Sequence, residues 1–392
     1  MSPQPLVPPG PALTAAEIGR YSRHLLLPEV GQDGQRRLAA ARVLVVGAGG
    51  LAAPVLSYAA AAGVGHLTVV DDDAVDVSNL QRQVIHRTAD VGVAKVRSAE
   101  RAVRELNPGV EVVGVAERVS ADNALELFAD HDVIVDATDN FATRYLVNDA
   151  CVLLGLPLVW GAIHRFDGQV SVWWAGEGPC YRCVFPVAPP VGAVPSCAEA
   201  GVLGSIPGVI GSTQATEIVK LILGIGRPLT GRMLVHDALA GDWSSVPVAR
   251  DPDCPVCGEH PTIRSLTDSA SSCMSQVPSP VAPAPTVTAR ELARLVAVGE
   301  PVRVVDVRSD AERSIAVLPF GSHVELSRLE DGGAFSDVTD LAGDEPVVFY
   351  CKSGVRSARA VQLAAGRGIS ARSLDGGILA WIADIDPSLT AY

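Results

Sequence analysis

A strand, a glycine-rich turn and a helix follow one another near the start of the sequence, and this succession restricts the possible folds most. The run RVLVVG (residues 42–47) is apolar after its arginine, as is typical of a parallel strand buried on both faces. The turn GAGGLA (residues 47–52) then begins an alanine-rich helix predicted over Leu51–Ala62. Glycines let the backbone approach a phosphate, and a helix N-terminus offers it free N–H groups. Gly47, Gly49 and Gly50 are therefore predicted to bind a nucleotide.

Such a turn is weak evidence by itself, because glycine-rich turns also serve plain helix–sheet packing, and it does not distinguish NAD from ATP. Further support comes from Asp71, which ends the next predicted strand about 20 residues after Gly50. In nucleotide-binding folds a carboxylate at this position binds ribose hydroxyls. The following segment contains Ser78, Asn79, Leu80, Gln81 and Arg82, and Lys95 comes soon after it. Asn79 can bind ribose or base, whereas Arg82 and Lys95 can neutralise a triphosphate or can be solvated surface charges.

Apolar runs alternate with helical patterns through the first two thirds of the chain. Further strands are predicted over His66–Asp71, Val110–Val115, Val133–Asp136, Pro157–Trp160 and Gln169–Trp174, and further helices over Tyr21–Pro28, Lys95–Leu106, Phe141–Leu154 and Ile206–Leu223. Strands that alternate with helices through short connections predict an α/β fold with a doubly wound, Rossmann-like sheet.

Asp139 and Asn140 directly follow the predicted strand Val133–Asp136, at the carboxyl edge of the sheet where ligands bind. A carboxylate at this edge can hold Mg²⁺ beside phosphates. A helix N-cap is the alternative, since both residue types favour that position.

Length and charge limit the classes of function. The chain has 392 residues, too many for one ordinary core, so two domains are expected. Its net charge of −13 opposes nucleic-acid binding by the chain as a whole. The first residues contain no basic and apolar signal segment, which predicts a cytoplasmic protein. Val43–Gly65 is uncharged and long enough to span a bilayer, but its glycines and Pro54 favour a buried strand–turn–helix.

Eight cysteines without an export signal favour metal binding or catalysis over disulfides. Four of them form two C-x₂-C pairs, Cys180 with Cys183 and Cys254 with Cys257. Each pair can supply half of a tetrahedral zinc site, although the gap between the pairs is longer than in usual zinc ribbons. A redox dithiol and reduced buried cysteines are the alternatives. Because four protein ligands close the coordination sphere, the expected zinc is structural.

A second α/β pattern follows a segment rich in Ser, Pro and Ala. The predicted organisation is a flexible N-terminus over residues 1–16, a nucleotide-binding domain over 17–264, a linker over 265–285 and a small α/β domain over 286–392. In the last domain, helices are predicted over Thr288–Val298, Ser357–Ala365 and from Gly377, and strands over Val302–Val307 and Val347–Tyr350.

Cys351 follows the last of these strands in the sequence CKSGVRS, at a tight loop that begins a helix. Backbone N–H groups and a helix N-terminus stabilise a thiolate there, and the same cup could hold a persulfide. Lys352 and Arg356 add positive charge, so Cys351 and Arg356 are predicted catalytic residues. A buried structural cysteine is the alternative, and phosphatase action is a related chemistry.

The series RYSRHLLLPEVG, GAGGLA, SNLQRQVIH, VGVAK, DATDN and CYRC resembles the MoeB/ThiF branch of ubiquitin-activating-like adenylyltransferases along residues 17–258. The resemblance implies that Gly50, Asp71, Asn79, Arg82 and Lys95 hold ATP and that Asp139 holds Mg²⁺. It also implies a homodimer in which Arg23 reaches the partner subunit's phosphates. Ala52 departs from the family, which usually has glycine there.

The Cys-x₄-Arg loop, Asp306-Val-Arg308 and Asp375-Gly-Gly377 resemble rhodaneses, although the turn LPFGS (residues 318–322) departs from the usual pattern. Together the two modules resemble the MoeZ-type adenylyltransferase/sulfurtransferases. This resemblance implies adenylation of the C-terminal glycine of a small ubiquitin-like sulfur-carrier protein that ends in Gly-Gly. Sulfur from thiosulfate or a persulfide donor would then pass from a Cys351 persulfide to the carrier. An NAD-dependent oxidoreductase with a regulatory rhodanese and a non-catalytic carrier-binding scaffold are the alternatives.

Three cysteines lie outside these motifs. By the same resemblance, Cys197 lies where related enzymes carry a cysteine that forms a thioester or transient disulfide with the carrier, and it is otherwise a bystander. Cys151 is predicted in the core and Cys273 in the linker, without a role.

Overall fold

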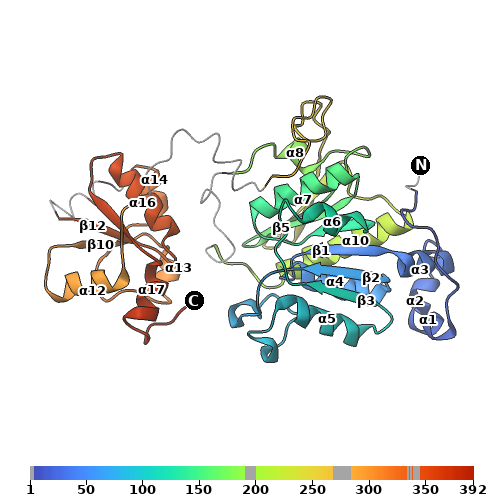
Figure 1. The fold of residues 1–392 in the computed structure, drawn as a ribbon, viewed down its shortest axis with the longest axis horizontal. Helices are drawn as coiled ribbons and strands as arrows, with labels where there is room; N and C mark the ends of the chain where they lie inside the picture. The colour runs from blue at the N-terminus through green and yellow to red at the C-terminus, as the bar shows by residue number, and fades with distance from the viewer. Residues whose placement is uncertain (1–3, 190–199, 268–283, 333–334, 336–337, 339–344) are drawn as a thin grey trace. The chain divides into compact units, whose positions relative to one another are not determined.

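The computed structural model describes residues 4–189, 200–267, 284–332, 335, 338 and 345–392. Two compact units make up the chain, Met1–Val277 and Pro278–Tyr392 (Figure 1). The division falls between the two predicted domains. The flexibility predicted for the linker stays a prediction, because residues 268–283 lie outside the described part of the chain.

The first unit is built on an eight-stranded sheet with the order β3-β2-β1-β4-β5-β6-β7-β8. Its strands are β1 (Arg42–Val46), β2 (His66–Val70), β3 (Glu111–Val115), β4 (Val133–Asp136), β5 (Leu158–His164), β6 (Asp167–Trp173), β7 (Arg232–Asp237) and β8 (Asp242–Pro247). The pairs from β3 to β5 are parallel, and those from β5 to β8 are antiparallel. The predicted Rossmann-like α/β class is confirmed, and an antiparallel half extends the sheet.

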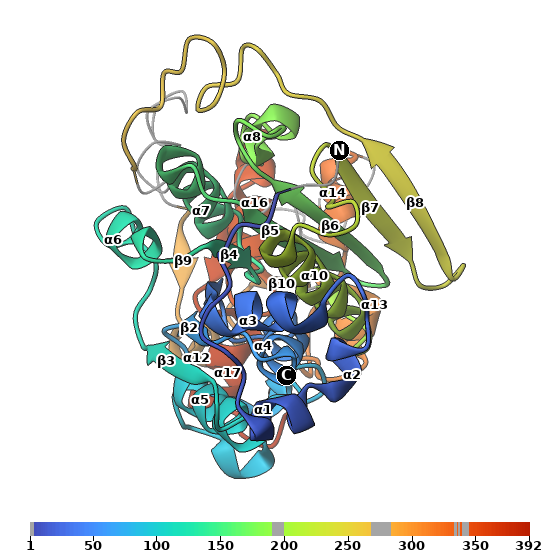
Figure 2. The same ribbon diagram turned by 90° about the vertical axis from the view of Figure 1, so that its right-hand side faces the viewer.

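Helices cover both faces of this sheet (Figures 1 and 2). They are α1 (Ala15–Arg20), α2 (Ser22–Leu25), α3 (Gly31–Ala40), α4 (Ala52–Ala62), α5 (Lys95–Leu106), α6 (Ala124–Ala129), α7 (Phe141–Leu154), α8 (Tyr181–Val184) and α10 (Ile206–Leu223). Along β1, Val43 and Val45 enter the core shared with α4 and α10, whereas Leu44 and Val46 enter the core shared with α7. Burial on both faces explains why this strand is continuously apolar.

The strand order places the first site. The chain proceeds from β1 to β2 and β3 on one side and returns to β4 and β5 on the other. The connections that leave β1 and β4 therefore diverge, and a crevice forms at the carboxyl ends of these neighbouring strands. Gly47 follows β1, Asp71 follows β2 and Asp139 follows β4, so the topology brings their segments to one edge.

The second unit has a parallel five-stranded sheet with the order β11-β10-β12-β13-β9. Its strands are β9 (Thr286–Val287), β10 (Arg303–Asp306), β11 (Ser322–His323), β12 (Val347–Tyr350) and β13 (Ala371–Leu374). Its helices are α12 (Ala289–Ala297), α13 (Asp310–Arg313), α14 (Leu326–Glu330), α16 (Val355–Ala365) and α17 (Gly377–Asp384). One hydrophobic core lies on each face of the sheet.

The described part of the N-terminal segment differs from the flexible tail expected over residues 1–16. The Val7 side chain is only 5% exposed and joins the core of the first unit. Arg37 donates a hydrogen bond to the Val7 carbonyl, and the Leu6 N–H donates to the Leu221 carbonyl at 3.4 Å. These contacts hold a proline-rich segment that has no periodicity of its own.

The uncharged stretch Val43–Gly65 divides into β1 and α4, as predicted. Among the described residues, none of the helices combines the length and apolar character that crossing a bilayer requires.

Close packing between α4 and α10 generates a stability prediction. A Cβ atom on Gly211 would lie 2.4 Å from both the Leu51 carbonyl oxygen and Pro54 Cγ, whereas nothing lies within 4 Å of one on Gly208. Gly211→Ala is expected to destabilise the first unit by about 1–3 kcal/mol through overpacking. Gly208→Ala in the same helix should be neutral or stabilise it by up to about 1 kcal/mol. Thermal melting of both variants tests this, and equal melting temperatures would contradict the packing argument.

Candidate functional site

A cavity of about 350 Å³ lies at the carboxyl edge of the large sheet, between the segments that follow β1, β2 and β4. Nine of the predicted nucleotide-binding residues line it, namely Gly47, Gly49, Gly50, Asp71, Asn79, Arg82, Lys95, Asp139 and Asn140. The sequence did not single out Gln83, Glu117, Arg118, Thr138 and Thr143, which also line it. Thr143 lies in the first turn of α7, and the other four come from loops whose position depends on the sheet.

The glycine turn requires glycine for two different reasons. Gly47 has φ +97°, a backbone conformation that residues with a side chain rarely adopt. A Cβ there would also lie 3.0 Å from the Ala137 carbonyl oxygen. A Cβ on Gly50 would lie 3.1 Å from Pro207 Cβ, on α10. One on Gly49 would make only ordinary contact with Gln83. Ala52, the departure from the family pattern, is fully buried in the core, so its methyl group packs without reaching the cavity.

Asp71 binds the turn as well as facing the cavity. One of its carboxylate oxygens accepts a hydrogen bond from the Ala48 N–H at 2.8 Å, and the other accepts one from the Asp73 N–H at 2.9 Å. The Lys95 ammonium lies 2.7 Å from an Asp73 oxygen and 4.0 Å from Asp71. Burial raises the pKa of Asp71 above its usual value, although Lys95 opposes this rise. The structure thus brings a buried lysine and two carboxylates to one wall of the cavity.

A buried histidine supports the other side of the turn. His86 Nε2 lies 2.9 Å from the Ala48 carbonyl, and Nδ1 lies 2.8 Å from Ser98 Oγ, which donates to Asp90. Burial lowers the pKa of His86. His86 belongs to the motif SNLQRQVIH, but nothing in that motif indicates that its ring contacts the glycine turn.

Residues 78–82, which precede α5, fall into two groups: some line the cavity and the others do not. Arg82 and Asn79 line the cavity, and Arg82 Nη1 donates to the Ser78 carbonyl at 3.0 Å. Ser78, Leu80 and Gln81 were also predicted to bind the nucleotide, but their side chains do not line the cavity. The Ser78 hydroxyl instead donates to Asp76, which caps this 3₁₀ turn.

Asp139 and Asn140 have different surroundings, which the sequence left open. The Asn140 side chain accepts a hydrogen bond from the Thr143 N–H at 2.8 Å and caps α7. Asp139 is exposed and lines the cavity next to it. Asp136, on β4, is fully buried beneath both and accepts hydrogen bonds from the Thr138 N–H and hydroxyl. The N-cap interpretation therefore holds for Asn140, whereas Asp139 is an exposed residue that lines the cavity.

One predicted residue lies elsewhere, and another cannot be placed. Arg23 is exposed on α2 and does not line the cavity of its own chain. Cys197 lies outside the described residues.

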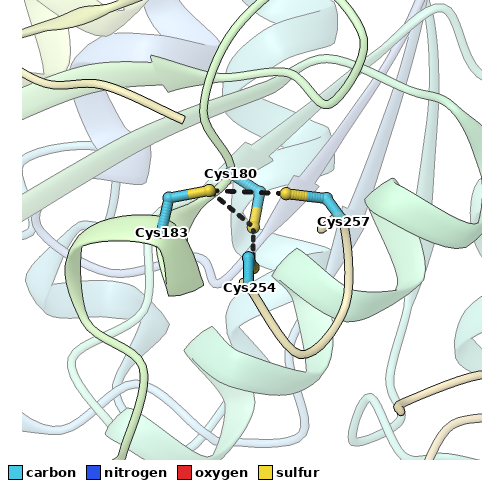
Figure 3. Close-up of side chains that lie close together, drawn as sticks. All are labelled: Cys180, Cys183, Cys254 and Cys257. Carbon is cyan, nitrogen blue, oxygen red and sulfur yellow. Dashed lines mark hydrogen bonds between the residues drawn. The ribbon is translucent and has the colours of Figure 1, made fainter. Parts of the chain in front are cut away.

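The two C-x₂-C pairs meet in the first unit, although 70 residues separate them (Figure 3). The Cys180 and Cys254 sulfurs are 3.6 Å apart, those of Cys183 and Cys257 are 3.4 Å apart, and those of Cys180 and Cys183 are 3.9 Å apart. A tetrahedral zinc–thiolate site, with Zn–S bonds of about 2.3 Å, requires sulfurs about 3.8 Å apart. Spacing and donor type therefore fit a four-coordinate soft metal such as zinc.

Cys351 begins the sulfur loop, the name used here for residues 351–356, which follow β12 and include the first two residues of α16. Its side chain is buried, and its sulfur accepts hydrogen bonds from the Gly354 N–H at 3.1 Å and from the Ser357 hydroxyl at 3.5 Å. Gly354 has φ +99°, the conformation that turns its N–H toward the sulfur. Part of the predicted cup is thus present, together with the Ser357 hydroxyl, which the local sequence did not indicate as a donor to the sulfur.

The rest of the sulfur loop is held from two sides. Both Arg356 amino groups donate to Glu312 on α13, at 2.7 and 2.6 Å. Burial would raise the pKa of Glu312, but Arg356 and the hydrogen bonds from Ser309 together hold that pKa below its usual value. The second contact comes from Gly377, the first residue of α17, where a Cβ would lie 2.5 Å from the carbonyl oxygens of Cys351 and Lys352. This close approach explains the second glycine of the sequence Asp375-Gly-Gly377.

Known families match both parts of the chain. The model of the ThiF family matches residues 21–256, and that of the rhodanese-like domain matches residues 288–384. “Probable adenylyltransferase/sulfurtransferase MoeZ” of Mycobacterium tuberculosis is 46% identical over 395 residues, covering 99% of this chain and 98% of that protein. “Adenylyltransferase and sulfurtransferase MOCS3” of Bos taurus is 43% identical over 409 residues, covering 98% and 90% respectively.

The first unit has relatives of its own. “Sulfur carrier protein adenylyltransferase” of Thermus thermophilus is 55% identical over 265 residues, covering 66% of this chain and 98% of that protein. The crystal structure of E. coli MccB superposes with a TM-score of 0.55 at 23% identity, covering 62% of this chain and 73% of that one, which shows a shared fold.

A Rossmann-like unit with a cavity at the carboxyl edge of its sheet, joined to a unit with a thiol loop, defines an enzyme of two modules. The chain belongs to the ThiF family, among the members that also carry a rhodanese-like domain. The resemblance to MoeZ-type adenylyltransferase/sulfurtransferases is thereby confirmed, and the oxidoreductase and scaffold alternatives are not favoured.

The different surroundings of Asp139 and Asn140 predict different effects on stability. Asn140→Ala removes the cap of α7 and should lower the free energy of unfolding by about 1 kcal/mol. Asp139→Ala removes an exposed side chain and should change it by less than about 0.5 kcal/mol. Urea melting compares the two, and a larger loss for Asp139→Ala would contradict the assignment of the cap.

Proposed function

We propose that this enzyme adenylates the C-terminal glycine of a small ubiquitin-like sulfur-carrier protein and then converts it to a thiocarboxylate with sulfur carried on Cys351. The observation that carries the proposal is the cavity that gathers the glycine turn, Arg82, Lys95 and Asp139, in a chain that also holds the sulfur loop. The names of the near full-length relatives, which pair an adenylyltransferase with a sulfurtransferase, support both steps.

In the first step the carrier's carboxylate attacks the α-phosphorus of ATP. A bond forms between the carboxylate oxygen and phosphorus, the bond to the leaving oxygen breaks, and pyrophosphate departs with the electron pair. Negative charge accumulates on the phosphate oxygens, so fixed positive groups lower the barrier. Arg82 and Lys95 are assigned this role, while Asp71 and Asn79 orient the ribose.

Lys95 is suited to such a task because its ammonium is already held in place. Its partners Asp73 and Asp71 fix it at the wall of the cavity, so little side-chain entropy is lost when phosphate binds. Asp139 supplies the hard carboxylate oxygen that Mg²⁺ prefers. When bound, the ion neutralises charge on the phosphates.

In the second step the Cys351 thiolate takes up sulfur from thiosulfate or a persulfide. With thiosulfate, the thiolate attacks the terminal sulfur, the sulfur–sulfur bond of the donor breaks, and sulfite leaves with the electron pair. The Gly354 N–H and the Ser357 hydroxyl, which bind the sulfur, favour its anionic form.

The terminal sulfur of the Cys351 persulfide then attacks the acyl-adenylate and displaces AMP, which leaves an acyl disulfide. A second thiolate attacks the Cys351 sulfur, releases the carrier thiocarboxylate and forms a disulfide with Cys351. Cys197 or an external thiol supplies this reductant. The linker keeps both modules on one chain and raises their effective concentration.

A structural zinc site and an arginine supplied to a second subunit complete the proposal. Zinc is held by Cys180, Cys183, Cys254 and Cys257 with no open position, so it stabilises the fold without taking part in the reaction. Arg23, which is exposed and does not line the cavity of its own chain, is assigned to the phosphates of a second subunit in a homodimer, where it would stabilise the developing charge.

The intact mass of a Gly-Gly-tailed carrier, incubated with the enzyme, ATP, Mg²⁺, thiosulfate and a mild thiol reductant, tests the proposal. We expect a gain equal to the exchange of one oxygen for sulfur. Cys351→Ala should abolish that gain but still release pyrophosphate, whereas Asp139→Ala should lose both by a factor of about 100 or more.

The two variants distinguish the activity of the adenylation module from that of the sulfur-transfer module. Pyrophosphate release without a change in carrier mass in the native enzyme would leave the activation step standing and refute the sulfur step. If several carriers elicit neither product, the adenylation proposal itself fails.

Metal analysis of the purified chain should find one zinc ion per chain. Cys254→Ala removes one of four ligands and should lose the metal and lower the melting temperature, because structural zinc contributes directly to folding. Cys151→Ala is the matched control, since this thiol is buried in the core of the large sheet and lies apart from the cluster. Full zinc retention in Cys254→Ala would refute the site.

A further inference from the structure

Tyr392 lies where two ion pairs of the second unit meet. Its hydroxyl oxygen accepts a hydrogen bond from Arg308 Nη1 at 2.6 Å and donates one to Glu312 Oε1 at 3.3 Å. Arg308 is fully buried, and two of its nitrogens donate to the Asp306 carboxylate at 2.9 and 2.7 Å. The phenol therefore joins a buried ion pair at the end of β10 to a carboxylate at the rim of the sulfur loop.

Glu312 carries this connection into the sulfur loop, because it binds both amino groups of Arg356. An unbroken series of hydrogen bonds thus runs from Asp306 through Arg308, Tyr392 and Glu312 to Arg356. Burial raises the pKa of Tyr392 although Arg308 opposes the rise, so the phenol stays protonated at neutral pH and can donate to Glu312.

The ring of Tyr392 contacts the other cation of the loop. Lys352 Nζ lies 4.8 Å from the ring centroid, within the distance of a cation–π interaction. One side chain therefore reaches Lys352 directly and Arg356 through Glu312. These are the two positive side chains of the loop that carries Cys351.

We propose that Tyr392 is a positioning residue that holds Lys352 and Arg356 in place for an anionic sulfur donor of the thiosulfate type. The proposal rests on the proposed function of Cys351 and extends it to the chemistry of the donor. Tyr392 acts on donor binding through the two cations. The bonds to the Cys351 sulfur come from Gly354 and Ser357, so the reactivity of the thiol is set separately.

The test is thiocyanate formation from thiosulfate and cyanide by the full chain, with Tyr392→Phe and Tyr392→Leu. Tyr392→Phe keeps the ring over Lys352 and loses the hydrogen bonds, so the KM for thiosulfate should rise about threefold. Tyr392→Leu loses both contacts and should raise this KM about tenfold. The kcat of both variants should stay within about twofold of the native value, since only donor binding is weakened.

Leu389→Ala is the matched control. Leu389 packs against the same core as Tyr392, so this variant loosens the segment without removing the contacts to the loop. It should leave the KM for thiosulfate unchanged, and the melting temperatures of all variants report any loss of fold. An unchanged KM in Tyr392→Leu, or a loss confined to kcat, would overturn the positioning role while the sulfur step stands. A native chain that takes no sulfur from thiosulfate would refute the sulfur step with this donor, and the role of Tyr392 with it.

Discussion

The conformation of the glycine turn after β1 is the constraint on which the first module depends. The Ala48 N–H is bound by Asp71 from the end of β2, and the Ala48 carbonyl is contacted by His86. Gly47 packs against the Ala137 backbone beyond β4, so the turn is held by segments from both sides of the strand reversal. Preorganised backbone groups of this kind need little rearrangement when a charged ligand binds. The nucleotide cavity is therefore a consequence of strand order as much as of the glycines.

The two modules use the same arrangement of strand, glycine loop and helix to bind different anions. In each, a parallel strand ends in a loop with a left-handed glycine and continues as a helix, Gly47 with φ +97° after β1 and Gly354 with φ +99° after β12. In both loops a second segment approaches closely: a Cβ on Gly47 would lie 3.0 Å from the Ala137 carbonyl oxygen, and one on Gly377 would lie 2.5 Å from the Cys351 carbonyl oxygen. The first loop suits phosphates and the second a thiolate or persulfide, because both are anions that backbone N–H groups stabilise.

The cysteine cluster performs a different task, since it joins parts of the chain that the sheet alone does not fix. Cys180 and Cys183 lie at the start of α8, just after β6, whereas Cys254 and Cys257 follow β8 at the end of the antiparallel half. Bringing four sulfurs within 4.8 Å of one another ties these segments together. Four thiolates at this spacing repel each other strongly unless a cation lies between them, so fold and metal binding are expected to be coupled.

Local periodicity and spacing were enough to predict the fold class, the position of most helices and strands, the glycine turn, both cysteine pairs and the sulfur loop. Lys95–Leu106, Phe141–Leu154 and Ile206–Leu223 match their predicted helices to the residue. Only the tertiary structure shows that Asn140 caps a helix beside the exposed Asp139, that His86 supports the glycine turn, and that Tyr392 reaches the sulfur loop. Each of these depends on the direction of one side chain toward a segment distant in sequence, and no local pattern encodes that direction.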